Sequence, residues 1–183
     1  MSFFIWLIVL GVMQSYQSFS IVKVSRSSNS LMMSVKVALT REIGHNNKLG
    51  SLLHDCEVLE IPCIEFAAGE DCDKLPSAIL EHDLIVITSP QASNVFVSVW
   101  ESLNNKPLNL SIATVGKGTS QPLIKVGITP CFEPSDATAE TLAIELPTHF
   151  GNKVLYPTSS IAKDTLLEGL ESRGFKVIKI KLF

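Results

Sequence analysis

Several features that mark common protein classes are missing from this 183-residue sequence. Its four cysteines form no C-x-x-C pair and its four histidines show no paired ligand spacing, so the usual zinc motifs are excluded. A basic excess is missing too, because 15 Lys and Arg stand against 18 Asp and Glu, and nucleic-acid binding is therefore not expected. The cysteines are predicted to be reduced, mostly structural thiols: Cys56, Cys63, Cys72 and Cys131.

Acidic residues are also missing from the start of the chain, where the first carboxylate is Glu42. The apolar run from Phe3 to Met13 is shorter than the roughly 20 residues that span a bilayer, and it is typical of a signal-peptide core. A signal anchor or a core strand is the alternative for this run. The serine-rich, acid-free stretch from Ser15 to Ser34 is typical of an organellar transit peptide.

Signal and transit segments in series are similar to the bipartite leaders of plastids bounded by extra membranes. We therefore predict a leader over residues 1–34, plastid (chloroplast) localisation and no stable membrane association once the leader is removed. Without Lys23 and Arg26, 13 basic residues remain against 18 acidic ones, which gives the mature part a formal charge of −5. Oligomeric state has no sequence signal, and a monomer is the default expectation.

From Val35 onward short β-branched runs alternate with helical patterns, which predicts β-α-β units and a parallel sheet. Leu84 to Ile87 is apolar at every position, as in a strand buried on both faces, whereas Lys176 to Lys181 alternates like an edge strand. The small, acidic stretch Ala67 to Asp73 predicts a linker between two lobes. The expected strands are 35–40, 58–61, 84–88, 110–115, 129–132, 153–156 and 176–182, and the expected helices are 46–55, 75–82, 90–103, 119–126, 138–150 and 161–173.

Three strand-to-helix junctions carry the candidate chemistry. They are Thr88-Ser89-Pro90, with Ser89 as a helix cap, Gly116-Lys117-Gly118-Thr119, and Thr158-Ser159-Ser160, with Ser160 as a cap. In a parallel sheet such junctions lie at one edge, where helix N-termini favour anions. Each turn taken alone is also explained as an ordinary helix start. The glycine-rich turn lacks the third glycine of a dinucleotide-binding motif and the Lys-Ser that follows the glycines of a phosphate-binding loop. A flavodoxin-like nucleotide binder is therefore disfavoured.

Taken in order, the segments V-A-L-T-R-E, I-T-S-P-Q-A, V-G-K-G-T, E-P-S-D-A-T-A-E-T-L and V-L-Y-P-T-S-S-I-A-K-D-T-L-L-E-G-L-E-S-R-G resemble those of uroporphyrinogen-III synthases, from about Val35 to the last residue. The resemblance implies an α/β fold in which a three-layer, parallel-sheet lobe of flavodoxin-like topology is joined to a second lobe through a β ladder. It also implies cyclisation of hydroxymethylbilane, a linear tetrapyrrole, to uroporphyrinogen III, with inversion of ring D, loss of water, and no cofactor or metal.

The resemblance assigns the domains as an incomplete first lobe at 35–57, a linker strand at 58–66, a complete lobe at 67–175 and a returning ladder strand at 176–183. The residues expected to bind substrate carboxylates are Arg41, Thr88, Ser89, Gly116, Thr119, Ser159 and Ser160, with Lys117 and Lys163 as weaker candidates. The catalytic residue is unknown, because Phe183, which has no hydroxyl, stands at the family's tyrosine position. Since little of the first lobe is present, low or no activity is expected for this chain alone, and a non-catalytic tetrapyrrole- or polyanion-binding module is the alternative.

Overall fold

The computed structural model describes residues 7–10, 20–24, 35–40, 44, 46–63 and 65–183. The chain divides into two compact units, Met1–Phe66 and Ala67–Phe183. None of the helices in the described ranges is long and apolar enough to cross a bilayer.

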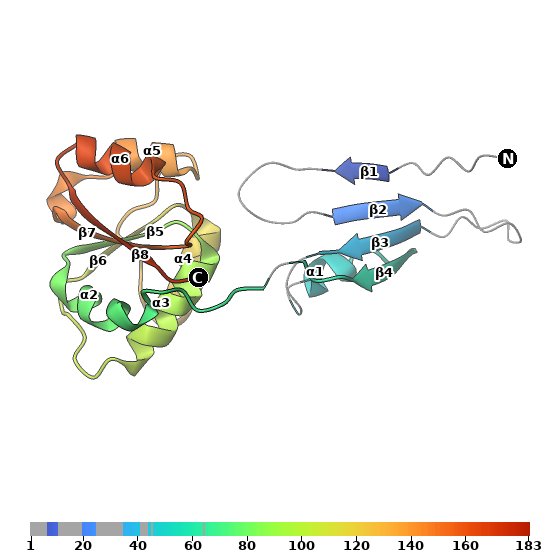
Figure 1. Ribbon diagram of the computed structural model, residues 1–183, viewed down its shortest axis with the longest axis horizontal. Coiled ribbons are helices and arrows are strands. Elements are labelled where there is room, and N and C mark those ends of the chain that lie inside the picture. Colours follow the sequence, from blue (N-terminus) through green and yellow to red (C-terminus); the bar gives the residue numbers. More distant parts are fainter. Residues whose placement is uncertain (1–6, 11–19, 25–34, 41–43, 45, 64) are drawn as a thin grey trace, which may run out of the picture. The chain divides into compact units, whose positions relative to one another are not determined.

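The first unit contains a four-stranded sheet in the order β1-β2-β3-β4 (Figure 1). β1 (Leu7–Leu10) and β2 (Ser20–Val24) pair antiparallel with each other, and β2 pairs antiparallel with β3 (Val35–Leu39). β3 pairs in parallel with β4 (Cys56–Glu60), so these two strands form the predicted β-α-β unit. Most of the predicted leader lies outside the described residues, and that assignment stays a prediction.

The helix expected over Asn46 to Asp55 is much shorter than predicted. α1 covers only Asn47–Gly50, and Leu49 and Leu52, which lie within the predicted range, are 36% and 69% exposed. The predicted boundary between residues 57 and 58 is also wrong, because it cuts through β4, which pairs along its length with β3. Periodicity alone does not set a helix length, and here the helical pattern is overridden after one turn.

The second unit is a three-layer α/β domain around a parallel sheet in the order β6-β5-β7-β8 (Figure 1). Its strands are β5 (Leu84–Ile87), β6 (Ser111–Thr114), β7 (Lys153–Thr158) and β8 (Lys176–Lys181). All four residues of β5 are buried, which confirms the prediction of a central strand, and β8 lies at an edge of the sheet as its alternating pattern predicts. Residues 129–132 form only a bridge, in which Phe132 pairs with Ala113.

Helices cover both faces of this sheet. One face packs against α2 (Leu75–Glu81), α3 (Pro90–Ser102) and α4 (Lys117–Lys125), with Ile79, Phe96 and Leu123 fully buried. The other face packs against α5 (Ala139–Glu145) and α6 (Thr165–Ser172), through Leu142, Leu166 and Leu170. One-turn 3₁₀ helices cover Cys72–Lys74 and Thr148–Phe150. The second of these lies where helix was expected to continue to Phe150, and Pro147 explains the break because it cannot continue the α5 hydrogen-bond ladder.

The end of the chain differs from the predicted ladder strand. Residues 176–181 belong to the parallel sheet, where they pair along their whole length with β7. Only the last residues lie beside the linker, where the Gly69 and Asp71 N–H groups donate to the carbonyl oxygens of Leu182 and Lys181, at 2.8 and 3.2 Å. The predicted boundary between residues 175 and 176 is therefore wrong, since the edge strand belongs to the second unit.

Candidate anion-binding edge of the parallel sheet

The carboxyl ends of β5, β6 and β7 lie at one edge of the second unit's sheet, because these strands are parallel neighbours. The turns that follow them contain Thr88-Ser89, Gly116 to Thr119 and Ser159-Ser160. We call this the carboxyl edge. The structure therefore brings six of the seven predicted binding residues to one edge, while Arg41 lies outside the described residues.

The turn after β5 has the predicted cap. Ser89 is extended and its Oγ accepts a hydrogen bond from the Ala92 N–H at 3.1 Å, while Pro90 occupies the first turn of α3. Proline is favoured there because the missing N–H has no partner within the helix. α3 is 13 residues long, so its N-terminus carries the partial positive charge of a full helix dipole next to Thr88.

The turn after β6 differs in detail from the prediction. α4 begins at Lys117, two residues before the predicted start, with Gly116 as an extended cap residue. Thr119 therefore lies inside the first turn, where it is 2% exposed. Its carbonyl oxygen accepts a hydrogen bond from Ser93 Oγ at 2.6 Å, which ties α4 to α3 and holds the two helix starts together.

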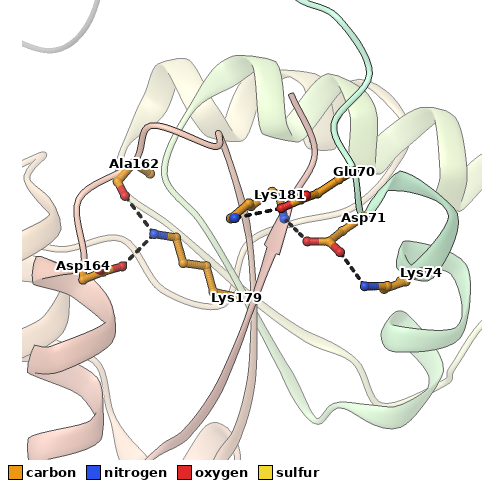
Figure 2. A network of polar contacts seen from close by, with 7 residues as sticks. All are labelled: Glu70, Asp71, Lys74, Ala162, Asp164, Lys179 and Lys181. Atoms are coloured by element: carbon orange, nitrogen blue, oxygen red, sulfur yellow. Dashed lines mark hydrogen bonds and ion pairs between the residues drawn. The ribbon is translucent and has the colours of Figure 1, made fainter.

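Ser160 does not cap a helix, so that prediction is wrong. α6 begins at Thr165, and the Ser160 N–H donates instead to the Phe183 carbonyl oxygen at 2.7 Å. Lys179 on β8 holds the intervening loop through the Ala162 carbonyl, 2.8 Å away, and the Asp164 carboxylate, 2.7 Å away (Figure 2). These contacts come from the far end of the sequence, which is why a local capping pattern could not reveal them.

Sequence reasoning missed Glu133 as a member of this edge. Thr114 donates to the Glu133 carboxylate at 3.3 Å, and Ser120, in the first half of α4, also hydrogen-bonds it. The two hydroxyls lie 2.6 Å apart. The signal was in the quoted segment E-P-S-D-A-T-A-E-T-L, which begins with this glutamate.

Tyr156 is a second residue whose place at the edge the sequence did not reveal. Its hydroxyl lies 3.4 Å from Thr88 Oγ1 and accepts a hydrogen bond from Thr158 Oγ1 at 3.3 Å. Tyr156 and Thr158 are each 4% exposed. The edge thus contains buried hydroxyls as well as helix starts.

The remaining candidates are less well placed. Lys117 and Lys163 are exposed side chains at the first turn of α4 and in the loop before α6. Phe183 is half-buried and its ring packs against the core between the sheet and α2 and α3. Within the described ranges, no three His, Cys, Asp or Glu side chains converge as they would around a metal ion.

The fold and the turns at its carboxyl edge define an open α/β domain, a class in which ligands bind at the carboxyl ends of the strands. The family model described as uroporphyrinogen-III synthase HemD matches residues 53–183, and the chain belongs to this family. The chain is 37% identical over 159 residues to the chloroplastic uroporphyrinogen-III synthase of Oryza sativa subsp. japonica, a match that covers 80% of this chain and 52% of the relative.

Two further comparisons agree with this assignment. The porphyrin biosynthesis protein HemD of Ruminiclostridium josui is 29% identical over 165 residues, which cover 83% of this chain and 32% of that protein. The solved structure of uroporphyrinogen III synthase from the extremely thermophilic bacterium Thermus thermophilus matches with a TM-score of 0.55 at 17% identity, over 80% of this chain and 60% of that one. The fold is therefore that of the family, and the chain spans about half the length of the plant relative.

Proposed function

We propose that this protein acts as a uroporphyrinogen-III synthase, which closes hydroxymethylbilane to uroporphyrinogen III with inversion of ring D and loss of water. Family membership supports the reaction, and the carboxyl edge supports the substrate class. The observation that carries the proposal is the meeting of the Ser89, Gly116 and Ser159 turns at the ends of three parallel strands.

A tetrapyrrole with several carboxylate side arms needs anion sites that are spread over a surface. The start of α3 and the start of α4 supply backbone N–H groups and dipole charge without any basic patch, which suits a chain with more acidic than basic residues. Thr88, Ser89, Gly116, Thr119, Ser159 and Ser160 are the proposed carboxylate-binding residues of this unit. Arg41 is proposed as an ion-pair partner that follows β3.

Catalysis in this proposal rests mainly on folding the bilane so that its two ends meet. Positioning of that kind lowers a barrier by removing translational and rotational freedom before the bond forms. The departing water needs a proton, and Phe183 cannot supply one because its ring has no hydroxyl. The proposed reaction requires no cofactor.

The lack of a hydroxyl at position 183 favours a second candidate, a non-catalytic module that binds the tetrapyrrole without converting it. The two candidates share the carboxyl edge and differ only in turnover.

We further propose plastid localisation through a bipartite leader at residues 1–34, supported by the serine-rich, acid-free composition of Ser15 to Ser34 and by the chloroplastic relative. A fluorescent fusion of residues 1–34 that remained in the cytosol of plastid-bearing cells would contradict this localisation.

The experiment that tests the main proposal couples the purified protein to an enzyme that generates hydroxymethylbilane and separates the porphyrin isomers formed. Type III isomer above the level of a protein-free control supports the synthase. Type I isomer alone, as from spontaneous closure, together with saturable binding of uroporphyrin III, supports the binding module. Absence of both turnover and binding contradicts both candidates.

A further inference from the structure

The parallel sheet forks between its two central strands. The structure describes every residue of β5 and β7, and their pairing consists of Leu84 with Val154 and Ile85 with Leu155. Beyond that point β5 stays paired with β6 as far as Ile87, and β7 stays paired with β8 as far as Thr158. Pro157 has no N–H to donate, which explains why the inner ladder stops while the outer ladders continue.

The fork lies where the chain reverses its direction of winding. α3, which follows β5, packs on one face of the sheet through Phe96, whereas α6, which follows β7, packs on the opposite face through Leu166. Figure 1 shows the two helices on opposite sides of the strands. In open α/β sheets the carboxyl ends of such neighbouring strands are where ligands bind, because the two connections leave room between them.

Hydroxyl groups bridge this fork where the backbone does not. Tyr156 comes from β7, and its ring leans along the strand so that its hydroxyl reaches both Thr158 and, across the fork, Thr88. Thr158 donates to the Tyr156 hydroxyl at 3.3 Å, which leaves the phenol proton available to Thr88 Oγ1, 3.4 Å away, in a pair where either hydroxyl can be the donor. When the phenol donates in this pair, Thr88 Oγ1 is the acceptor, and the hydrogen of its own hydroxyl is left for a ligand.

We propose that Tyr156 is a positioning residue that replaces the missing ladder bonds between β5 and β7. It holds the Ser89 and Ser159 turns at a fixed spacing and orients the Thr88 hydroxyl as a donor to a carboxylate of the tetrapyrrole. The identity of the ligand rests on the proposed function, whereas the holding of the two turns does not. Tyr156 is not assigned a part in bond making, because its hydroxyl is buried and engaged with two threonines.

The experiment uses the full-length protein and its Tyr156→Phe variant, which keeps the ring and removes only the hydroxyl. Backbone hydrogen exchange is measured at Ala92 and Ser93, after β5, and at Ser160 and Ala162, after β7. We expect exchange at both sites to rise by about tenfold, the effect of losing hydrogen bonds worth roughly 1.4 kcal/mol in all, while Thr119 and Ser120 after β6 stay unchanged. Unchanged exchange at both sites, or an equal rise across the whole sheet, would overturn the proposal.

Binding of uroporphyrin III gives the second readout. Tyr156→Phe and Thr88→Val should each weaken binding by about fivefold. The double variant should bind no more weakly than the weaker of the two single variants, because both changes break the same hydrogen bond between Tyr156 and Thr88. Additive losses would contradict the orientation of Thr88 by Tyr156. Ser172→Ala, which removes an exposed hydroxyl at the opposite end of α6, is the matched control for unaltered binding. If the wild-type protein neither binds the porphyrin nor forms the type III isomer, the proposed function fails, and the exchange experiment still decides the role of Tyr156.

Discussion

Gly69, in the linker, donates its backbone N–H to the carbonyl oxygen of Leu182, near the end of the chain, at 2.8 Å. A Cβ atom on Gly69 would lie 2.4 Å from the Lys181 carbonyl oxygen and 2.7 Å from the Phe183 nitrogen. Because these are backbone atoms, they cannot move aside as a side chain would. The contact therefore requires glycine and fixes where the linker meets the β8 edge.

Gly69→Ala should destabilise the second unit by about 2 kcal/mol, since an overpacked site forces the backbone apart. Chemical denaturation followed by circular dichroism measures the effect. Gly118→Ala is the matched control, because a Cβ there meets only the Pro90 side chain at 3.9 Å and alanine favours the helix. Equal stability of the Gly69→Ala variant and the wild type would show that the two segments are not in contact in solution.

Two substitutions at Ser89 distinguish its role as the cap of α3 from its proposed role in anion binding. Ser89→Ala should cost about 1 kcal/mol of stability because the Ala92 N–H loses its acceptor. Ser89→Asp should keep the cap and stay within about 0.5 kcal/mol of the wild type. It should nevertheless weaken uroporphyrin III binding by about tenfold, because a carboxylate then occupies the anion site. Unimpaired binding by the aspartate variant would remove α3 from the proposed site.

The network between the linker and β8 predicts a loss of stability in acid. Hydrogen bonds from the Lys74 ammonium and from the Lys181 backbone N–H lower the pKa of Asp71 (Figure 2). A lowered folded-state pKa means that the contribution of Asp71 is present above its unfolded pKa and is lost as the pH falls through the folded value. That window lies below about pH 4.

Asp71→Asn should therefore flatten the dependence of unfolding free energy on pH below about pH 4, as measured by urea unfolding at several pH values. Asp73→Asn, an exposed neighbour, is the control. The same contacts raise the pKa values of Lys74 and Lys181, chiefly through hydrogen bonds to Asp71 and Glu70 respectively. The stability that these two lysines contribute is fully present below their pKa in the unfolded chain, and it is lost only as the pH rises through their raised pKa in the folded protein. An unchanged acid profile for Asp71→Asn would contradict this account.

Adding a hydroxyl at position 183 tests whether its absence limits the formation of the type III isomer. Phe183→Tyr should raise the fraction of type III isomer, because the resemblance to the family predicts a tyrosine here that could donate a proton to the departing water. Phe183→Leu serves as the control that alters the ring without adding a donor. If the tyrosine and wild-type proteins give the same isomer fraction, position 183 does not limit the reaction.

The sequence predicted the frame of the second unit well, and the reasons are local. The fully apolar run Leu84 to Ile87 is typical of a strand covered on both faces, and it is the buried β5. The Ser89-Pro90 pair marked the start of α3 because both capping and proline placement act within one turn. The alternating pattern of Lys176 to Lys181 likewise identified an edge strand.

The features that the sequence did not reveal depend on contacts between distant segments. Ser160 looks like a helix cap, but its N–H is taken by the Phe183 carbonyl, and Lys179 draws the following loop toward β8. The fork at Tyr156 also needs the register of β7 against both neighbours, which no local pattern contains. Glu133 joined the candidate site through hydroxyls from β6 and α4.

The central claim is that the turns after β5, β6 and β7 face one acidic tetrapyrrole together. Amide chemical shifts recorded while uroporphyrin III is titrated into the protein test it most directly. The account predicts that the amides of Gln91, Gly118 and Ser159 shift along one saturable curve, while Gly174, just before β8, stays still. Shifts confined to the opposite edge of the sheet, or different affinities at the three turns, would contradict it.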